Sequence, residues 1–348
     1  MDISLCMIVK NERDFLNACL KSVVDLIGLT DLVVVDTGST DGTRQIAVEF
    51  GARVFDFKWI DDFSAARNFA AEQAQNDWVL CVDADEEVVE IDKDVIRKFI
   101  NDPKKVGSVE RIDTANMSTF FFNRLYSRRL YRFEGTIHEQ IKPLDEAGAP
   151  VVSYEIPILL NHYGYTDEAV KKNDKISRNE RMLEDALNKA PDDPYLLFQM
   201  GKIFFNRQRD LPKACGFFEK SLALHPRAET EYVYSLVECY GYALINTGRY
   251  REAHELVERY KPSYWRYPHF RFLAGHVRQN AGMLIEAVEC FESCIGDKEW
   301  GYKGITSFLS YFNIGVILEA VGMKNDAVEM YKKAGDYPPA LERLKSLF

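Results

Sequence analysis

Short apolar runs alternate with stretches of helical periodicity over the first 85 residues, and this pattern restricts the fold more than any other feature. The predicted elements are strands at 3–9, 31–36, 52–57 and 77–85, and helices at 12–27, 40–50 and 64–75. Strands separated by helices of this length form βαβ units in a parallel sheet. Because the strands are apolar almost throughout, we expect helices to cover both faces of that sheet.

Polar clusters follow three of these strands at the points where the strands end. They are "KNE" at 10–12, "DTGSTDGT" at 36–43 and "DADEE" at 83–87. Ligands of open α/β sheets bind beyond the carboxyl ends of the strands. We therefore expect the three clusters to share one ligand-binding edge of the sheet.

Asp83 and Asp85 are the main candidates for chemistry at that edge. On an extended backbone alternate residues face the same way, and two adjacent carboxylates repel each other unless a cation lies between them. Mg²⁺ and Mn²⁺ are hard cations that bind carboxylate and phosphate oxygens. The pair therefore predicts a divalent metal, and a solvated turn that caps the next helix is the structural alternative.

The second half contains a repeat of small residues. Gly, Gly and Ala recur with offsets of seven and five, at 241, 248 and 253, at 275, 282 and 287, and at 315, 322 and 327. The first two copies are 34 residues apart, the period of tetratricopeptide repeats, and a displacement of six more before the third predicts an inserted turn. Phe218, Phe291 and Tyr331 should each pack across a helical hairpin. Stacked hairpins form a superhelix whose concave face binds partners.

The two halves predict two domains joined by a charged helix. We expect an α/β domain at 1–165, a linker helix at 166–194 that ends near Pro191 and Pro194, and a helical repeat domain at 195–348. Repeat domains often pair, so a homodimer is one expectation.

Composition and the N-terminus exclude several classes of protein. The net charge is −10 without a basic stripe, so nucleic acid is not an expected partner. No apolar run approaches the roughly 18 residues of a transmembrane helix, and the N-terminus lacks the features of a signal peptide. The seven cysteines are scattered and lie mostly in apolar stretches, which favours reduced thiols in a cytoplasmic protein.

Four blocks carry a resemblance to a known family. They are "SLCMIVKNE", "VVVDTGSTDGT", "DDFSAARNFA" and "CVDADEE". In this order the region 3–165 resembles family 2 glycosyltransferases. With "FEGTIHEQI", "LNHYGY" and the helical repeats, the chain resembles the bacterial subset with appended tetratricopeptide-like repeats, which includes enzymes that glycosylate cysteine in bacteriocin peptides. It also resembles lipopolysaccharide-core glucosyltransferases. The implied fold is an α/β GT-A nucleotide-sugar-binding domain, with a mostly parallel sheet between helices, followed by an all-α tetratricopeptide-like superhelical domain.

The resemblance implies an inverting, metal-dependent hexosyltransferase that uses a nucleotide diphosphate sugar, with UDP favoured by analogy. It places Glu12 near the nucleoside and Asp36 against the nucleobase. Asp83 would face the ribose or sugar, and Asp85 the metal. Arg67 lies in the block expected near the diphosphate or donor sugar, where a guanidinium can bind phosphate through two hydrogen bonds.

The metal shell and the base come from later blocks. A late histidine often completes the metal shell in GT-A enzymes, so the resemblance implies that His162 joins Asp85 and Asp83 around Mn²⁺ or Mg²⁺, which requires a neutral imidazole. Glu139 is the expected general base, and His138 would orient it or bind the acceptor. The structural alternative is a salt bridge of Glu139 with Arg128, Arg129 or Arg132.

The acceptor is expected to dock on the repeats as a peptide, a protein or a cell-surface glycan. Trp59 and residues 61–63 either close over the donor or pack against the sheet edge. The aromatic run at 260–272 is expected to be mostly core. A different class of function is a non-catalytic repeat scaffold with a relic transferase domain, which would bind no nucleotide sugar.

Overall fold

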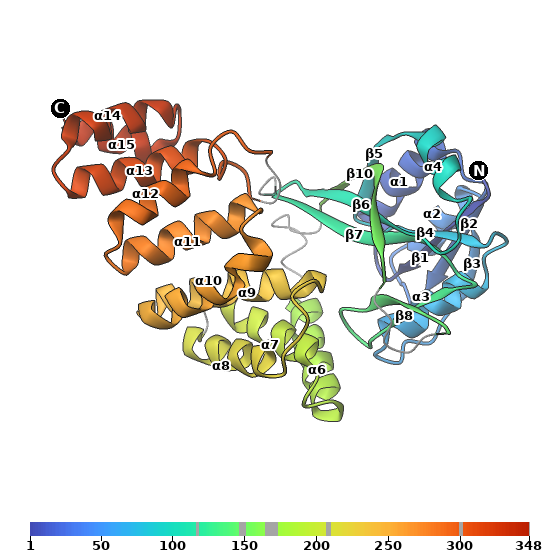
Figure 1. The fold of residues 1–348 in the computed structure, drawn as a ribbon. Helices are drawn as coiled ribbons and strands as arrows, with labels where there is room; N and C mark the ends of the chain where they lie inside the picture. The colour runs from blue at the N-terminus through green and yellow to red at the C-terminus, as the bar shows by residue number, and fades with distance from the viewer. Residues whose placement is uncertain (116–117, 146–150, 164–172, 207–209, 299–301, 348) are drawn as a thin grey trace. The chain divides into compact units, whose positions relative to one another are not determined.

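The computed structural model describes residues 1–348 apart from 116–117, 146–150, 164–172, 207–209, 299–301 and 348. The chain divides into two compact units, Met1–Ala186 and Leu187–Phe348 (Figure 1). Helix α6 (Asn173–Lys189) spans this division, within the segment predicted to join the halves. The start of that predicted segment lies outside the described residues.

The first unit is built on an eight-stranded sheet in the order β3-β2-β1-β4-β7-β6-β10-β5. Its strands are β1 (Ile3–Val9), β2 (Asp31–Asp36), β3 (Arg53–Asp56), β4 (Trp78–Cys81), β5 (Glu86–Ile91), β6 (Val106–Asp113), β7 (Ser118–Ser127) and β10 (Ser153–His162). Four of the seven neighbouring strand pairs in this sheet are parallel, and β4-β7, β7-β6 and β10-β5 are antiparallel. The predicted, mostly parallel α/β sheet is therefore confirmed. Strands β8 (Tyr131–Glu134) and β9 (Gln140–Pro143) form a separate antiparallel pair.

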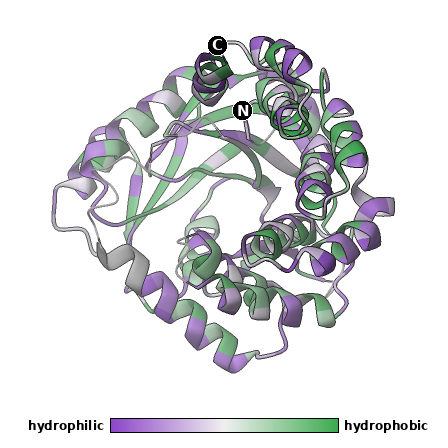
Figure 2. Cartoon of the chain, turned by 90° about the vertical axis from the view of Figure 1, so that its left-hand side faces the viewer, coloured by the Kyte–Doolittle hydropathy of each residue, from purple (hydrophilic) through white to green (hydrophobic). Residues whose placement is uncertain are grey.

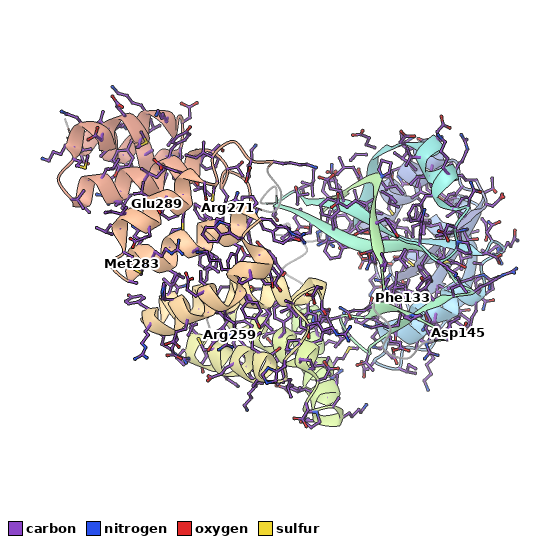
Figure 3. The ribbon with its side chains drawn as sticks, in the orientation of Figure 1. Phe133, Asp145, Arg259, Arg271, Met283 and Glu289 are labelled. Atoms are coloured by element: carbon purple, nitrogen blue, oxygen red, sulfur yellow. The ribbon has the colours of Figure 1, made fainter. Side chains whose placement is uncertain are left out.

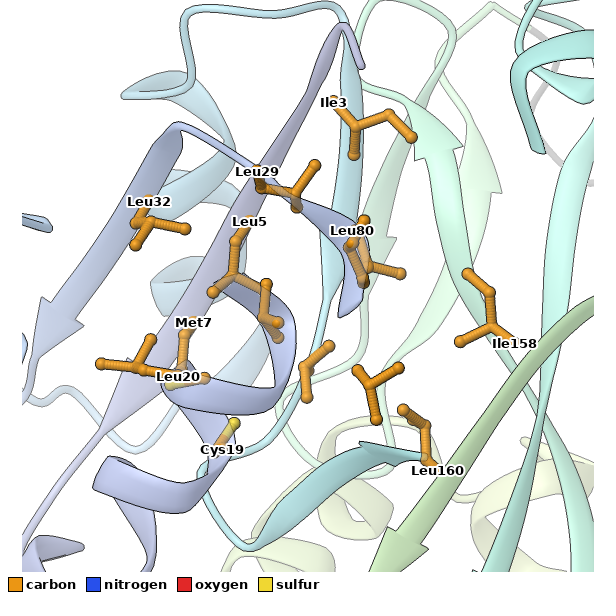
Figure 4. Close-up of a cluster of buried hydrophobic side chains, with 14 of the residues drawn as sticks. Ile3, Leu5, Met7, Cys19, Leu20, Leu29, Leu32, Leu80, Ile158 and Leu160 are labelled. Atoms are coloured by element: carbon orange, nitrogen blue, oxygen red, sulfur yellow. The ribbon is translucent and has the colours of Figure 1, made fainter. Parts of the chain in front are cut away.

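Helices cover both faces of the sheet, as the continuous apolar strands predict. They are α1 (Arg13–Ser22), which continues as a π-helical turn at Val23–Ile27, α2 (Thr43–Glu49), α3 (Phe63–Glu72) and α4 (Lys93–Phe99). Successive residues of β1 enter different cores: Leu5 and Met7 pack with Leu20 of α1 (Figure 4), and Cys6 packs with Ala70 of α3. Both faces of the central strand are thus buried.

The predicted fourth strand was too long. Strand β4 ends at Cys81, and a turn follows in which the Glu86 amide donates to the Asp83 carbonyl at 3.0 Å. Strand pairing explains the early end, because β4 is paired only as far as Cys81 with β1 and Leu80 with β7. Asp and small residues then favour a turn. Asp83 and Asp85 therefore do not share one face of an extended strand, and that part of the prediction was wrong.

The second unit is all helical. Its helices are α7 (Pro194–Asn206), α8 (Leu211–Ala223), α9 (Glu231–Asn246), α10 (Tyr250–Tyr264), α11 (Pro268–Asn280), α12 (Leu284–Glu292), α13 (Phe308–Ala320), α14 (Lys324–Lys333) and α15 (Pro338–Leu347). Figure 2 shows hydrophobic and hydrophilic residues mixed along these helices, as in amphipathic helices packed as hairpins. The longer link between α12 and α13 contains the predicted insertion. No helix among the described residues is long and apolar enough to cross a membrane.

Glycine–aromatic contacts close three of the hairpins. A Cβ added to each glycine would come within 3 Å of an aromatic ring in the next helix, so only glycine permits this approach. The pairs are Gly201 with Phe218 (2.4 Å), Gly275 with Phe291 (2.6 Å) and Gly315 with Tyr331 (2.6 Å). The predicted packing is confirmed for these three. At Gly241 the side chain opposite is Leu273 instead of an aromatic.

The cysteines and the aromatic run behave largely as predicted. All seven cysteines are free, and six of them are buried, including Cys290 and Cys294. Within the aromatic run Tyr264, Phe270 and Phe272 are buried core residues.

Candidate active site

Two of the three predicted polar clusters interlock at one edge of the sheet. Val9 and Asp36 end the parallel strands β1 and β2 side by side, so the loops that follow them meet. The Asn11 side-chain oxygen accepts from the Thr40 amide at 2.8 Å, and the Glu12 amide donates to the Thr43 hydroxyl at 2.8 Å. The expected common edge is therefore present for these clusters.

Asp36 holds the loop that follows β2 through two hydrogen bonds. Its side chain is buried, and its Oδ1 accepts from the amides of Gly38 (3.0 Å) and Ser39 (2.8 Å). Gly38 has a φ of 109°, a conformation that residues with a side chain rarely adopt. Glu12 begins α1, because its carbonyl accepts from the amides of the first helical turn, and its side chain is half-buried. Both residues thus hold in place the loops that follow β1 and β2.

Two arginines bind Asp83. Arg67 Nη2 donates to Oδ1 at 2.8 Å, and Arg124 Nη2 donates to Oδ2 at 2.7 Å. Burial raises the pKa of Asp83, but Arg124 and Arg67 outweigh it and hold that pKa far below its usual range. The sequence predicts a cation beside Asp83. In the structure the cations beside Asp83 are the guanidiniums of Arg67 and Arg124.

Arg67 connects the sheet edge to the β8–β9 hairpin. It lies on α3, its Nε donates to Glu139 Oε1 at 2.6 Å, and its guanidinium lies 5.5 Å from the ring centre of Phe133, which Figure 3 labels. Asn68, the next residue of α3, binds both the amide and the carbonyl of Phe133 at 2.9 Å. Helix α3 thereby fixes the hairpin loop that carries His138 and Glu139.

Glu139 has a different partner from the three proposed for it in the structural alternative. Within the described residues Arg128 donates to the Asn76 carbonyl, and Arg129 and Arg132 pair with Asp77 and Glu134. The salt bridge of Glu139 is with Arg67. His138 precedes Glu139, is exposed, and has a φ of 54°, which marks a strained turn.

Sequence reasoning missed Arg124 and Arg111. Arg124 on β7 also donates to Glu86 Oε1 at 3.0 Å, and Arg111 on β6 reaches the same oxygen at 3.4 Å. Glu86 is fully buried, and its Oε2 accepts from the Asp83 amide at 2.9 Å. The available signal was a charged residue inside an apolar strand, as in "FFFNRLY", because such a residue requires a partner.

Asp85 lies beside His162 at the end of β10. His162 Nε2 is 3.6 Å from Asp85 Oδ2, and His162 Nδ1 is 2.7 Å from Asp113 Oδ1. Burial lowers the pKa of His162, but the hydrogen bonds to Asp113 and Asp85 outweigh it and raise the pKa to about 9. Asp113, the third missed residue, therefore sets the orientation of the imidazole.

These contacts join into one chain of charges along the sheet edge. In order, its described members are Glu139, Arg67, Asp83, Arg124, Glu86, Arg111, Asp113, His162 and Asp85. Five carboxylates and three guanidiniums give a formal charge of −2 while His162 is neutral. A divalent cation would balance that charge.

The donor atoms at Asp85 and His162 fit such a cation. Histidine ligands of metals usually donate their second ring N–H to a carboxylate, which is the role that Asp113 can play for His162. Each oxygen of Asp83 accepts a hydrogen bond from an arginine, so in this structure Asp83 is paired with guanidiniums. Among the described residues no group of three His, Cys, Asp or Glu could hold a metal ion. The site therefore offers two protein ligands and leaves other positions to water or phosphate oxygens.

The segment around Trp59 contacts helix α6. Trp59 Nε1 donates to Asp61 at 2.8 Å, and Arg178 of α6 lies 5.8 Å from the Trp59 ring centre and 5.2 Å from that of Phe63. Asp62 caps α3 by accepting from the Ala65 amide. The segment therefore leads into α3, the helix that carries Arg67, and it contacts α6 through Arg178.

Comparisons with known proteins find relatives of both halves of the chain. Residues 4–152 match the family described as glycosyl transferase family 2, and residues 309–340 match the tetratricopeptide repeat. The chain is 32% identical, over 67% of its length and 60% of the relative, to a TPR repeat-containing protein of Synechococcus elongatus. It is 28% identical, over 63% of its length and 53% of the relative, to the SPbeta prophage-derived glycosyltransferase SunS of Bacillus subtilis.

The chain spans less than two thirds of the length of these curated relatives. Among solved structures, that of YrrB, described as a TPR protein with an unusual peptide-binding site, covers 51% of this chain and 88% of its own, at 20% identity and a TM-score of 0.40.

Proposed function

Since the chain carries a glycosyltransferase family 2 domain followed by tetratricopeptide repeats, we propose that it transfers a sugar from a nucleotide diphosphate sugar to an acceptor bound by the repeats. The donor is a UDP-hexose, the transfer inverts the anomeric carbon, and the acceptor is a peptide, a protein or a glycan. Asp36 and Glu12 hold the loops that receive the nucleoside.

One observation supports this proposal most directly: the Asp85 and His162 donor atoms lie 3.6 Å apart at the ligand-binding edge, with Asp113 fixing the imidazole. We assign Mn²⁺ or Mg²⁺ to these two ligands. A bound divalent cation would stabilise the negative charge on the departing nucleoside diphosphate. Binding requires His162 to lose its proton, so affinity for the metal should rise with pH.

Arg67 is assigned two tasks. Its Nε and Nη2 position Glu139 and Asp83, and its buried Nη1, which has no hydrogen-bond partner among the described residues, is assigned to the donor's phosphate or sugar. Asp83, held by two arginines, is assigned to the ribose or sugar hydroxyls and not to the metal.

Glu139 is the proposed general base. Its Oε1 accepts from Arg67, which leaves Oε2 to take the proton from the acceptor's hydroxyl or thiol. The freed electron pair forms the new bond to the anomeric carbon. The bond from that carbon to the phosphate oxygen breaks, and its electrons leave with the nucleoside diphosphate. His138, beside the base, is assigned to acceptor contact.

The test is a thermal-shift and hydrolysis panel of UDP-, GDP- and TDP-sugars with the full chain, in Mn²⁺ and in EDTA. One nucleotide class should raise the Tm and be hydrolysed slowly, and only with the metal. Asp113→Asn should lower the affinity for Mn²⁺ by about 10- to 100-fold. Glu90→Gln, the same loss of charge at an exposed position of β5, should leave it unchanged.

Two outcomes would contradict parts of the proposal. If a nucleotide sugar still raised the Tm in EDTA, donor binding would not need a metal, and the assignment of a metal to Asp85 and His162 would be wrong. A chain that neither binds nor hydrolyses any nucleotide sugar would be a scaffold with a relic domain.

A further inference from the structure

Helix α9 of the repeat unit carries a carboxylate between two tyrosines. Tyr234, Glu238 and Tyr242 are four residues apart, so they lie on one face of the helix. Glu238 is half-buried and keeps part of its surface in solvent. Burial raises its pKa to about 7, since the protein around it desolvates the charged form. We call the position of Glu238 between the two tyrosines, which is partly desolvated but still reached by water, the recess.

Both tyrosines turn this face toward the next repeat. The Tyr242 ring centre lies 6.1 Å from that of His276 on α11, and the Tyr234 ring centre lies 5.1 Å from that of Tyr267, the N-terminal cap of α11. Aromatic rings from two repeats thus flank the recess around Glu238.

Glu238 has no hydrogen bond or ion pair with any described residue. Five cations of the surrounding helices have other partners, and the pKa shift of Glu238 comes from burial alone, without a contribution from any cation. They are Lys202 over the Phe198 ring, Arg249 with Glu252, Lys261 over the Trp265 ring, Arg271 with Asp297 and Arg278 with Glu258. Burial lowers the pKa of His276 to about 4, so this imidazole adds no charge at neutral pH.

Because its surroundings desolvate Glu238, they disfavour its charged form, and a cation bound beside it would favour that form again. Tyrosine faces attract cations as well, and ammonium groups are bound in aromatic recesses of this kind. A neutral glycan would gain little from either feature. The ligand chemistry that fits this position best is a cationic side chain.

We infer that Tyr234, Glu238 and Tyr242 form a recognition site for a lysine or arginine side chain of a peptide ligand. This inference rests on the proposed function only in identifying that peptide with the acceptor. It selects a peptide or protein acceptor over a glycan and requires a basic residue in the docked segment.

The experiment uses an array of synthetic random dodecapeptides with a central lysine, each printed a second time with acetyl-lysine at that position. The full chain should bind the lysine forms about tenfold more than the acetylated forms, given an ion pair with cation–π support. Glu238→Gln should abolish this preference, and Glu238→Asp should restore part of it. Glu289→Gln removes an exposed carboxylate of α12, labelled in Figure 3, and should keep the full preference.

Equal binding of both peptide forms by the wild type, or an unchanged preference in folded Glu238→Gln, would overturn the inference. Nucleotide-sugar binding is measured on the same samples. If the chain still binds a nucleotide sugar but shows no preference for lysine peptides, only the inference about the Glu238 recess is contradicted. A Glu238-dependent preference without donor binding supports the recess and contradicts the proposed transferase activity.

Discussion

The sheet edge of the first unit and the hairpins of the second are stabilised in different ways. At the sheet edge charged groups pair across long stretches of chain: Arg67 and Glu139 are 72 residues apart, and Arg124 and Asp83 are 41 apart. In the repeats glycine and its aromatic partner lie on neighbouring helices, as Gly275 and Phe291 do. The first arrangement spends stability on buried charge, and the second gains stability from close packing.

The comparison teaches where each kind of constraint comes from. Replacing buried ion pairs with apolar groups often leaves stability unchanged or improved, so their presence points to a functional need. Glycine–aromatic packing needs no such explanation, because close contact of helices is itself stabilising. Mutations should therefore affect function in the first unit and chiefly stability in the second.

The largest effect is expected from Asp83→Asn. This change leaves Arg67 and Arg124 buried with one carboxylate partner less, and breaking a buried pair costs about 3–5 kcal/mol. The free energy of unfolding of the first unit should fall by about that amount, and transferase activity should be lost. Hydrogen-exchange mass spectrometry on β4 and β7 peptides measures the local loss.

Asp77→Asn is the matched control for that experiment. Asp77 pairs with Arg129 at 2.7 Å, but the Asp77 side chain is 41% exposed and that of Arg129 73%, so its removal should cost less than about 1 kcal/mol. Equal losses in the two variants would show that burial of the Asp83 network adds nothing to its energy.

A smaller effect is expected from Gly275→Ala in the repeats. The added Cβ would lie 2.6 Å from the Phe291 ring, and overpacking of this kind costs about 1–3 kcal/mol, partly offset by the higher helix propensity of alanine. Denaturant unfolding followed by far-UV circular dichroism measures it. Donor binding by the first unit should not change.

At Gly216, also in the repeat unit, the same substitution should have the opposite effect on stability. It lies inside α8, and a Cβ there meets nothing within 4 Å. Gly216→Ala should therefore stabilise the repeats by about 0.5–1 kcal/mol. A stabilising effect at both glycines would mean that the hairpin contact is not tight.

Much of the fold could be predicted because its signals are local. Apolar runs and helical periodicity located the first strands and helices, and fixed offsets between glycine and alanine located the hairpins. The end of β4 was mispredicted, because the pairing of β4 with β1 and β7 decides it. No short-range sequence pattern before Asp83 shows where β4 ends.

The site was predictable only in part, for the same reason. Asp85 and His162 were paired in advance through a family resemblance, but Arg124, Arg111 and Asp113 were not. Arg124 reaches Asp83, and Asp113 reaches His162, because β7 pairs with β4 and β6 pairs with β10 in the folded sheet. The pairing of Asp83 with two arginines was not predicted, because these arginines are remote from it in sequence.

The smallest expected effect concerns pH and would sharpen the contrast between the units. Burial lowers the pKa of His276 to about 4, against 6.5 for an ordinary histidine, so the unfolded chain binds more protons than the folded one between these values. The contribution of His276 to the stability of the repeats should therefore be full above pH 6.5 and fall as the pH drops toward 4. Glu238, whose pKa is raised to about 7, contributes in the opposite direction, because the folded chain binds its proton more readily. Asp83, whose pKa is lowered, keeps its charge over the same range.

His276→Phe keeps an aromatic ring beside Tyr242, Phe272 and Phe291 but cannot take up a proton. The variant should lose less stability than the wild type between pH 6.5 and 4, in urea titrations followed by exchange in α11 peptides. His269, whose pKa burial also lowers to about 4, should supply the remaining dependence. An identical pH profile in the variant would mean that His276 is solvated in the folded repeats, and the dry aromatic packing assigned to α11 would then be wrong.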